Sequence, residues 1–294
     1  MAKKEKKQSS SFRLPTFRLP IFLLLFTIVI GGWFVWQSSY PWKDFLFQYI
    51  ENGEILTWES RFTPEQIMAA HHSELIGDNN KRIYKEPSYK YYPYLLLDVK
   101  YTEDKKTREG ALLWGLTDGE LVLNTDTWES THGFKDCLEC HANRYDFKIL
   151  QALAKNKGSL TIESLQNELH VERDVLETWV EEAKTKHLII QKGNLVQMHF
   201  ENPKILATPK THIKQHLVSK PITTAQRIPK VYSRGKIIEL AKASYGNDLK
   251  IRSEQEIFLP AYSLEVLNPD GSIHTSDWNA VTGQRILPSY LNQK

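Results

Sequence analysis

The chain has 294 residues, of which 41% are hydrophobic and 25% are charged, and its formal net charge is +3. A chain of this length can bury more than one core, since domains usually have about 100–200 residues. Its two cysteines, Cys137 and Cys140, exclude a small fold held together by several disulfides.

The first predicted element is an apolar helix near the N-terminus, over 19–38. Residues 21–36 carry no charge, and six basic side chains but one acidic side chain precede them, all in the tail 1–18. About 20 apolar residues span a membrane, and basic flanking residues stay in the cytoplasm. We therefore expect a single-pass protein of the inner (cytoplasmic) membrane, with its N-terminus in the cytoplasm and its bulk outside.

Two alternatives to this transmembrane helix stay open. A cleaved signal peptide has the same order of charges, although the bulky residues Trp33–Trp36 do not suit cleavage and only Gln37–Ser39 does. A buried core helix is the other alternative, although a helix that is apolar all round suits an exposed N-terminus poorly.

A first α/β module is expected over 39–136. Thr63 and Pro64 predict the start of a short helix, because Thr favours the N-cap and Pro the first helical position. A strand over 91–101 and two short strands around the turn Asp118-Gly119 complete it.

A second α/β module is expected over 233–294. Ser233 can cap a helix, and residues 258–267 form a predicted strand before the turn Asn268–Gly271. Trp278 aligns with Trp114 at an offset of 164, and the strands before them align at an offset of 167. The matching order of elements predicts an internal repeat.

In this repeat Trp114 and Trp278 should occupy equivalent buried positions. We expect each indole to pack against the helix of its own module, near Ile67 and Leu240 respectively. The run of strand, Pro269-Asp270-Gly271 turn, strand and Asn279–Gln284 resembles PepSY-type modules. That resemblance implies α+β units with interaction or inhibitory roles rather than catalysis.

A different unit is expected between the modules, over 145–202. Helices are predicted over 145–157, 162–169 and 173–187, and a β-hairpin over 188–200. This order of elements resembles a winged helix-turn-helix domain. The predicted fold class is thus α+β: an N-terminal transmembrane helix and two helix-plus-β-hairpin modules flanking a winged-helix insertion.

The charges of this unit do not suit nucleic acid. Residues 172–186, the predicted recognition helix, carry five acidic and three basic side chains, whereas DNA binding requires cations. The basic charge lies in and around a predicted linker, 203–232, since residues 201–252 have a net charge of +8. This segment is either a solvated linker or a contact for anionic lipid headgroups or an acidic partner.

One motif carries chemistry, the run Cys137-Leu138-Glu139-Cys140-His141 in a predicted linker, 137–144. C-x-x-C-H permits attachment of haem c, with His141 as the axial ligand. With His132, the set Cys137, Cys140 and His141 also has the donors of a zinc site. A structural or redox-active disulfide is a third interpretation, and two thiols without a role are the fourth.

No catalytic triad, phosphate-binding glycine loop or carboxylate pair stands out in the sequence. We therefore interpret the chain as a membrane-anchored extracytoplasmic protein-binding or scaffolding protein without its own catalysis, with the membrane and a protein as partners. The first alternative is a c-type haem or dithiol electron-transfer protein that uses the C-x-x-C-H motif. The second is a membrane-tethered transcription regulator.

Overall fold

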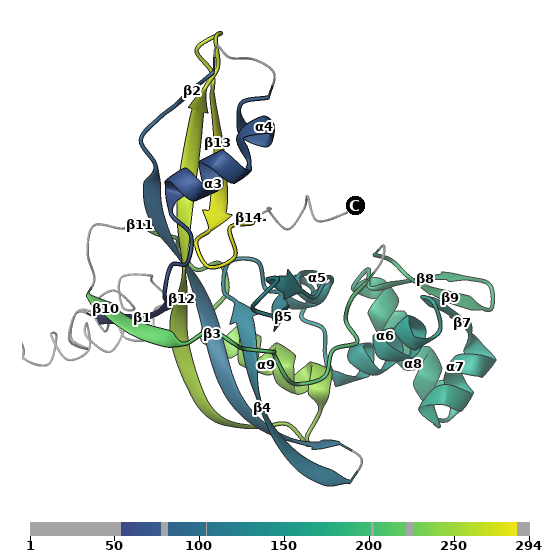
Figure 1. Cartoon of the computed structure of the whole chain (residues 1–294). Helices are drawn as coiled ribbons and strands as arrows, with labels where there is room; N and C mark the ends of the chain where they lie inside the picture. The colour runs from purple at the N-terminus through teal and green to yellow at the C-terminus, as the bar shows by residue number, and fades with distance from the viewer. Residues whose placement is uncertain (1–53, 78–81, 104, 201–202, 222–225, 287–294) are drawn as a thin grey trace, which may run out of the picture. The chain divides into compact units, whose positions relative to one another are not determined.

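The structure is a computed structural model that describes residues 54–77, 82–103, 105–200, 203–221 and 226–286. These residues form a mixed α/β fold with an eleven-stranded sheet, a three-stranded sheet and seven helices (Figure 1). The strands of the large sheet are β1 (Glu54–Trp58), β2 (Ile83–Tyr84), β3 (Ser88–Glu103), β4 (Lys106–Gly115), β5 (Leu121–Asn124), β6 (Glu129–Ser130), β10 (Leu217–Pro221), β11 (Gln226–Arg227), β12 (Lys250–Leu267), β13 (Ile273–Asn279) and β14 (Arg285–Ile286). The helices are α3 (Pro64–Ala70), α4 (His72–Leu75), α5 (Phe134–Glu139), α6 (Arg144–Lys155), α7 (Ile162–Leu169), α8 (Arg173–Thr185) and α9 (Arg234–Tyr245).

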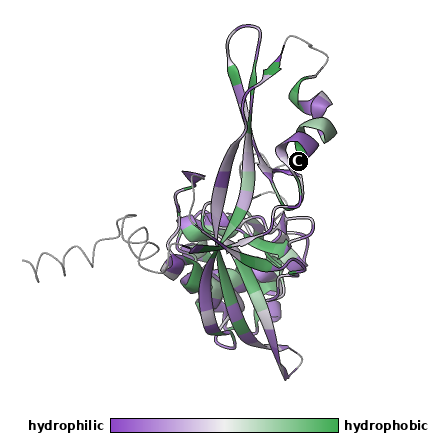
Figure 2. Cartoon of the chain, turned by 60° about the vertical axis from the view of Figure 1, so that its left-hand side comes forward, coloured by the Kyte–Doolittle hydropathy of each residue, from purple (hydrophilic) through white to green (hydrophobic). Residues whose placement is uncertain are grey.

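Two long antiparallel strands, β3 and β12, form the centre of the large sheet. Along β3 the side chains alternate between the faces, so that Leu95 and Leu97 enter one core and Tyr94 enters another. Figure 2 shows hydrophobic residues, in green, along these central strands. Strand β3 continues into β4 and β5, and β12 continues into β13 and β14.

The two hairpins that begin with β3 and β12 have the same register. Leu95 lies opposite Trp114 in the first, and Tyr262 lies opposite Trp278 in the second. The counterparts are 167 residues apart in the leading strands and 164 apart in the returning strands. Register is set by the hydrophobic pattern and the turn, so the two hairpins place corresponding side chains on the same face.

The pairing of β3 with β12 relates the two hairpins by a local two-fold axis. Tyr92 lies opposite Leu259, which follows it by the same 167 residues. An antiparallel pair of equivalent residues marks such an axis, because exchanging the strands leaves the pairing unchanged. The axis places the β3–β4 hairpin at one end of the long strands and the β12–β13 hairpin at the other (Figure 1).

Each hairpin is covered by the helix of the other half of the chain, and this corrects our expectation about the two indoles. Trp278 is fully buried in one cluster with Ile67 of α3. Trp114 is fully buried in another cluster with Ile237 and Leu240 of α9. Because β3 and β12 pair along their length, the helix that precedes each strand reaches the far hairpin.

The predicted fold class is wrong in treating these segments as two separate modules that flank an insertion. One continuous sheet contains strands from both segments, and the helices are exchanged between them. Local signals still place the helix starts: Thr63 caps α3 in a capping box, and Ser233 caps α9.

The unit between them contains α6, α7, α8 and a small sheet in the order β7 (Ser159–Thr161), β9 (Leu195–Met198), β8 (Ile189–Lys192). Helix α6 starts at a capping box of Asn143 and Asp146. Helix α7 starts at Thr161, whose side chain accepts from the backbone N–H of Ser164. This unit shares its largest core cluster with β3, β4 and α9.

The segment predicted as a basic linker, 203–232, is partly built into the large sheet. It contributes β10 and β11. Thr211 joins two neighbouring strands, since its hydroxyl accepts from Leu113 N at 3.0 Å and donates to Val122 O at 2.6 Å.

The membrane predictions also require correction. Over the part of the chain that the structure describes, no helix is both long and apolar enough to cross a membrane. The described helices have at most 13 residues, whereas a span needs about 20 apolar ones. The predicted transmembrane helix, 19–38, lies outside the described residues, and we retain neither this single-pass helix nor the location in the cytoplasmic membrane.

Candidate functional site

The C-x-x-C-H motif begins within a short helix, whose last three residues are Cys137 to Glu139, so the predicted linker 137–144 is partly helical. Helix α5 begins after Gly133, whose φ of 112° lies in the left-handed region. Phe134, Cys137 and Leu138 face the core, at the i, i+3 and i+4 spacing of one helix face. The motif is therefore packed against the large sheet.

A carboxylate that sequence analysis did not single out holds the start of this helix. Glu120 accepts hydrogen bonds from the backbone N–H groups of Gly133 at 3.0 Å and Lys135 at 3.1 Å. It also accepts from Phe134 N at 3.4 Å and from the Thr131 hydroxyl at 2.7 Å. The first N–H groups of a helix lack partners within the helix, so this buried carboxylate satisfies them.

The two thiols are free, and neither is suited to act as a thiolate. Cys137 is fully buried, and burial together with the charges around it raises its pKa well above the ordinary value. Burial, and after it the charge of Asp146, raises the pKa of Cys140 to about 11. Both groups are therefore protonated at neutral pH, whereas the thiolate is the form that binds metals and attacks disulfides.

The zinc interpretation does not fit the structure. His132 lies before α5 and pairs with Lys204 through backbone hydrogen bonds, whereas His141 follows the helix with an exposed side chain and a φ of 54°. Across the described residues, no group of three or more His, Cys, Asp and Glu side chains could hold a metal ion. The four predicted ligands are thus not brought together.

Haem attachment does not fit either. A haem that is joined through both thiols needs both sulfur atoms at a pocket large enough for the macrocycle. Only Cys140 reaches a pocket, while Cys137 lies in the packed core beside Phe134. Opening this core would expose the cluster that joins α5 to Trp114, whose ring lies edge-on to Phe134 at 5.1 Å.

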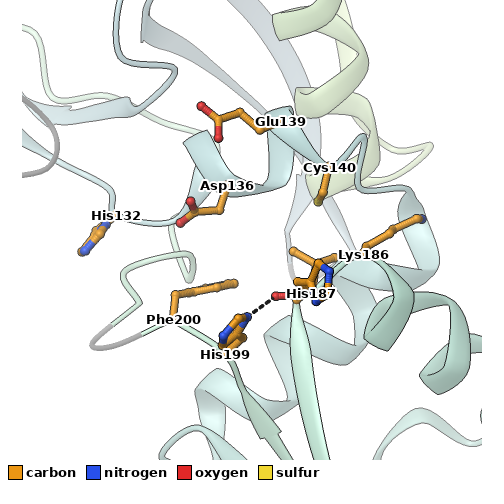
Figure 3. A pocket seen from close by; sticks show the side chains of 9 residues that line it. His132, Asp136, Glu139, Cys140, Lys186, His187, His199 and Phe200 are labelled. Carbon is orange, nitrogen blue, oxygen red and sulfur yellow. Dashed lines mark hydrogen bonds between the residues drawn. The ribbon is translucent and has the colours of Figure 1, made fainter.

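The pocket beside α5 is an open hollow of about 600 Å³. Figure 3 shows that Asp136 and Glu139 come from α5 and that Cys140 directly follows it. Lys186, His187 and His199 come from the unit of α6, α7, α8 and the small sheet, which we call the helical unit. The Lys186 ammonium is paired with Asp146 at 2.5 Å, and His199 Nδ1 lies 2.7 Å from the His187 carbonyl oxygen. Two of the polar side chains that line this hollow, Lys186 and His199, are thus already engaged with neighbouring groups.

A second hollow, of about 910 Å³, lies between α8 and the β8–β9 hairpin, and we call it the α8 groove. Its lining includes one basic side chain, Arg173, and four acidic side chains: Asp174, Glu177, Glu181 and Glu182. Arg173 is itself paired with Glu177 at 2.9 Å. The groove therefore presents a negative surface.

Comparisons with models of known families, with curated proteins and with solved structures found no match to this chain. The site is therefore interpreted from its own geometry. Of the residues that the structure makes prominent, Glu120 gave no signal in the sequence, because its partners lie 11 to 15 positions away across a turn. The acidic character of α8 was readable directly from the sequence.

Proposed function

We propose that this chain is a protein-binding or scaffolding protein without catalysis of its own, and that its α8 groove binds a cationic segment of a partner protein. The observation that carries the proposal is the charge of this groove, in which four carboxylates face one guanidinium. Charge complementarity of this kind guides association and selects the partner.

The order of helices and strands around the groove supports a resemblance to winged helix-turn-helix domains, in which the third helix and the wing make the contacts with a ligand. In a DNA-binding member the third helix enters the major groove. Here that helix has acidic side chains at Asp174, Glu181 and Glu182, which would repel phosphates. A protein partner with lysine and arginine side chains is the better match.

The surface of α8 and of the β8–β9 hairpin also favours a protein over a small ion as the ligand. The helix and the hairpin that form the groove also carry exposed apolar side chains, with Val175 and Leu195 each 40% exposed and Ile190 39% exposed. Interfaces combine an apolar contact area with a polar rim. The dithiol alternative has less support, since Cys137 is fully buried.

The test is the binding of a fluorescent peptide of alternating lysine and leucine residues to the full chain, followed by anisotropy. Glu181→Gln/Glu182→Gln should lower the affinity by roughly two- to thirtyfold, because two exposed charges contribute about 0.2–1 kcal/mol each. The matched control, Glu239→Gln/Glu254→Gln, removes two exposed acids from α9 and β12. The proposal would be contradicted if both double variants lost the same affinity for the peptide, or if the wild-type chain did not bind it.

A further inference from the structure

The turn that joins β4 to β5 contains an ionisable side chain where the equivalent turn after β13 has a neutral one. The two turns have the same backbone hydrogen bonds: Gly119 N donates to Gly115 O at 3.2 Å, and Gly283 N donates to Asn279 O at 2.8 Å. At the shared offset of 164 residues, Asp118 corresponds to Thr282. The two turns thus have the same backbone geometry, but the first has a carboxyl group where the second has a hydroxyl group.

The carboxylate of Asp118 occupies space that a side chain fills in the other turn. Asn279 places its amide oxygen inside its own turn, where it accepts from Val281 N at 2.8 Å. Its counterpart is Gly115, and a Cβ atom there would lie 1.9 Å from Asp118 Oδ1. The glycine therefore admits a carboxylate into a position that a neutral amide holds in the second hairpin.

The Asp118 carboxylate accepts a hydrogen bond from Glu120 N at 3.2 Å, and its own backbone N–H also stabilises the charged form. Burial, and with it the negative charge of Glu120, raises the pKa of Asp118 from its ordinary value of 3.8 to about 6, and Lys135 on α5 opposes this shift. From β3, Tyr94 faces the same turn, and its pKa is raised mainly by burial and then by the charge of Asp118.

This turn is linked to α5 by two routes. Glu120 holds the first N–H groups of the helix. Tyr232, which lies just before α9, packs over Gly119 and donates to Glu139 on α5 at 3.2 Å. Burial, and after it the charge of Glu139, raises the pKa of Tyr232 to about 12, so it stays a donor at neutral pH.

We propose that Asp118 makes the junction of this turn with α5 a pH-sensitive switch. The protonated carboxyl is neutral, as Thr282 is in the other turn, and the junction is closed. The ionised carboxylate stands in a poorly solvated site beside Glu120, so α5 opens more often. Because Asp136 and Glu139 of α5, and Cys140 directly after it, line the hollow beside the helical unit, the switch acts on that hollow and on the burial of Cys137.

The sign follows from the proton balance. The folded chain keeps the Asp118 proton up to about pH 6, whereas the unfolded or opened chain releases it near the ordinary value of 3.8. Stability at this corner therefore falls as pH rises between these values, and the loss persists above pH 6. A shift of this size allows at most about a hundredfold change in opening over the whole pH range, of which about tenfold falls between pH 5 and pH 8.

The experiment measures amide hydrogen exchange of the full chain at pH 5 and pH 8, after correction for the intrinsic exchange rates. The reporters are the helical N–H groups of Cys137, Cys140 and Ala142, which bond to Gly133, Asp136 and Cys137 respectively. In the wild-type chain their protection should fall about tenfold from pH 5 to pH 8. In Asp118→Asn, whose amide oxygen can still accept from Glu120 N, protection should be equal at both values.

The control is Asp270→Asn, at an exposed turn of the other hairpin, where the carboxylate accepts from Ser272 N at 2.9 Å. This variant should keep the wild-type fall in protection. A ¹³C titration of the Asp118 carboxyl in the wild-type chain supplies a second measurement that does not depend on any variant. The proposal would be overturned if the Asp118 carboxyl titrated near pH 3.8, or if amide protection in Asp118→Asn still fell from pH 5 to pH 8.

Discussion

Removal of the Glu120 carboxylate should destabilise the chain and expose the buried thiol. In Glu120→Ala the N–H groups of Gly133 and Lys135 and the hydroxyl of Thr131 lose an acceptor that lies 2.7 to 3.1 Å away. Each lost bond to a buried carboxylate costs about 1–1.5 kcal/mol after partial rescue by water, so we expect a loss of about 3–4 kcal/mol in the free energy of unfolding. Glu120→Gln keeps one oxygen acceptor and should lose about half as much.

The assay for this prediction has two parts. Urea unfolding followed by tryptophan fluorescence gives the free energy, because Trp114 lies in the same cluster as α5. Labelling of Cys137 by a thiol reagent, in a Cys140→Ser background, reports the opening of the core. The control is Glu129→Ala, which removes an exposed carboxylate paired with Lys204 at 3.2 Å and should change little. If Glu120→Ala behaved like this control, with Cys137 unreactive, our account of the helix would be refuted.

Two further predictions concern the exchanged helices and the α8 groove. Trp278→Ala should lower the free energy of unfolding by about 3–5 kcal/mol and increase hydrogen exchange in α3 rather than in α9, because the indole is buried with Ile67. The control, Ile273→Ala, changes an exposed position of the same hairpin and should leave exchange in both helices unchanged. The full chain should not retard duplex DNA in a gel at low salt, where nonspecific binding is strongest, because the α8 groove is acidic; retardation that weakens steeply with added salt would contradict this.

Local elements were readable from the sequence because their signals are local. The side chains of Thr63, Asn143, Thr161 and Ser233 each cap the helix that follows, and the residue type needed at an N-cap is specific. Helix α5 could also have been predicted, since Phe134, Cys137 and Leu138 have the spacing of one helix face. The cysteines were instead interpreted as ligands in a linker.

The exchange of helices could not be predicted in this way. A helix with one apolar face fits either hairpin, because both present the same pattern of buried side chains around Trp114 and Trp278. The choice depends on the pairing of β3 with β12 over ten residue pairs, and these pairs join residues at least 150 positions apart. Hydrophobic periodicity contains no information about such a pairing.

The path of the chain explains how the α8 groove can serve binding without disturbing the large sheet. His132, before α5, pairs with Lys204, so the chain leaves and re-enters the large sheet at one place. The helical unit is anchored through α6, where the Arg144 guanidinium donates to the carbonyl of Ser244 at 2.6 Å, near the end of α9. Helix α8 contributes Leu176 and Ala183 to the shared core, while its acidic side chains line the groove on another face. A partner bound in that groove would therefore contact a face of α8 that does not pack against the large sheet. Any effect of α5 on that groove would have to pass through α6 and its contact with the end of α9.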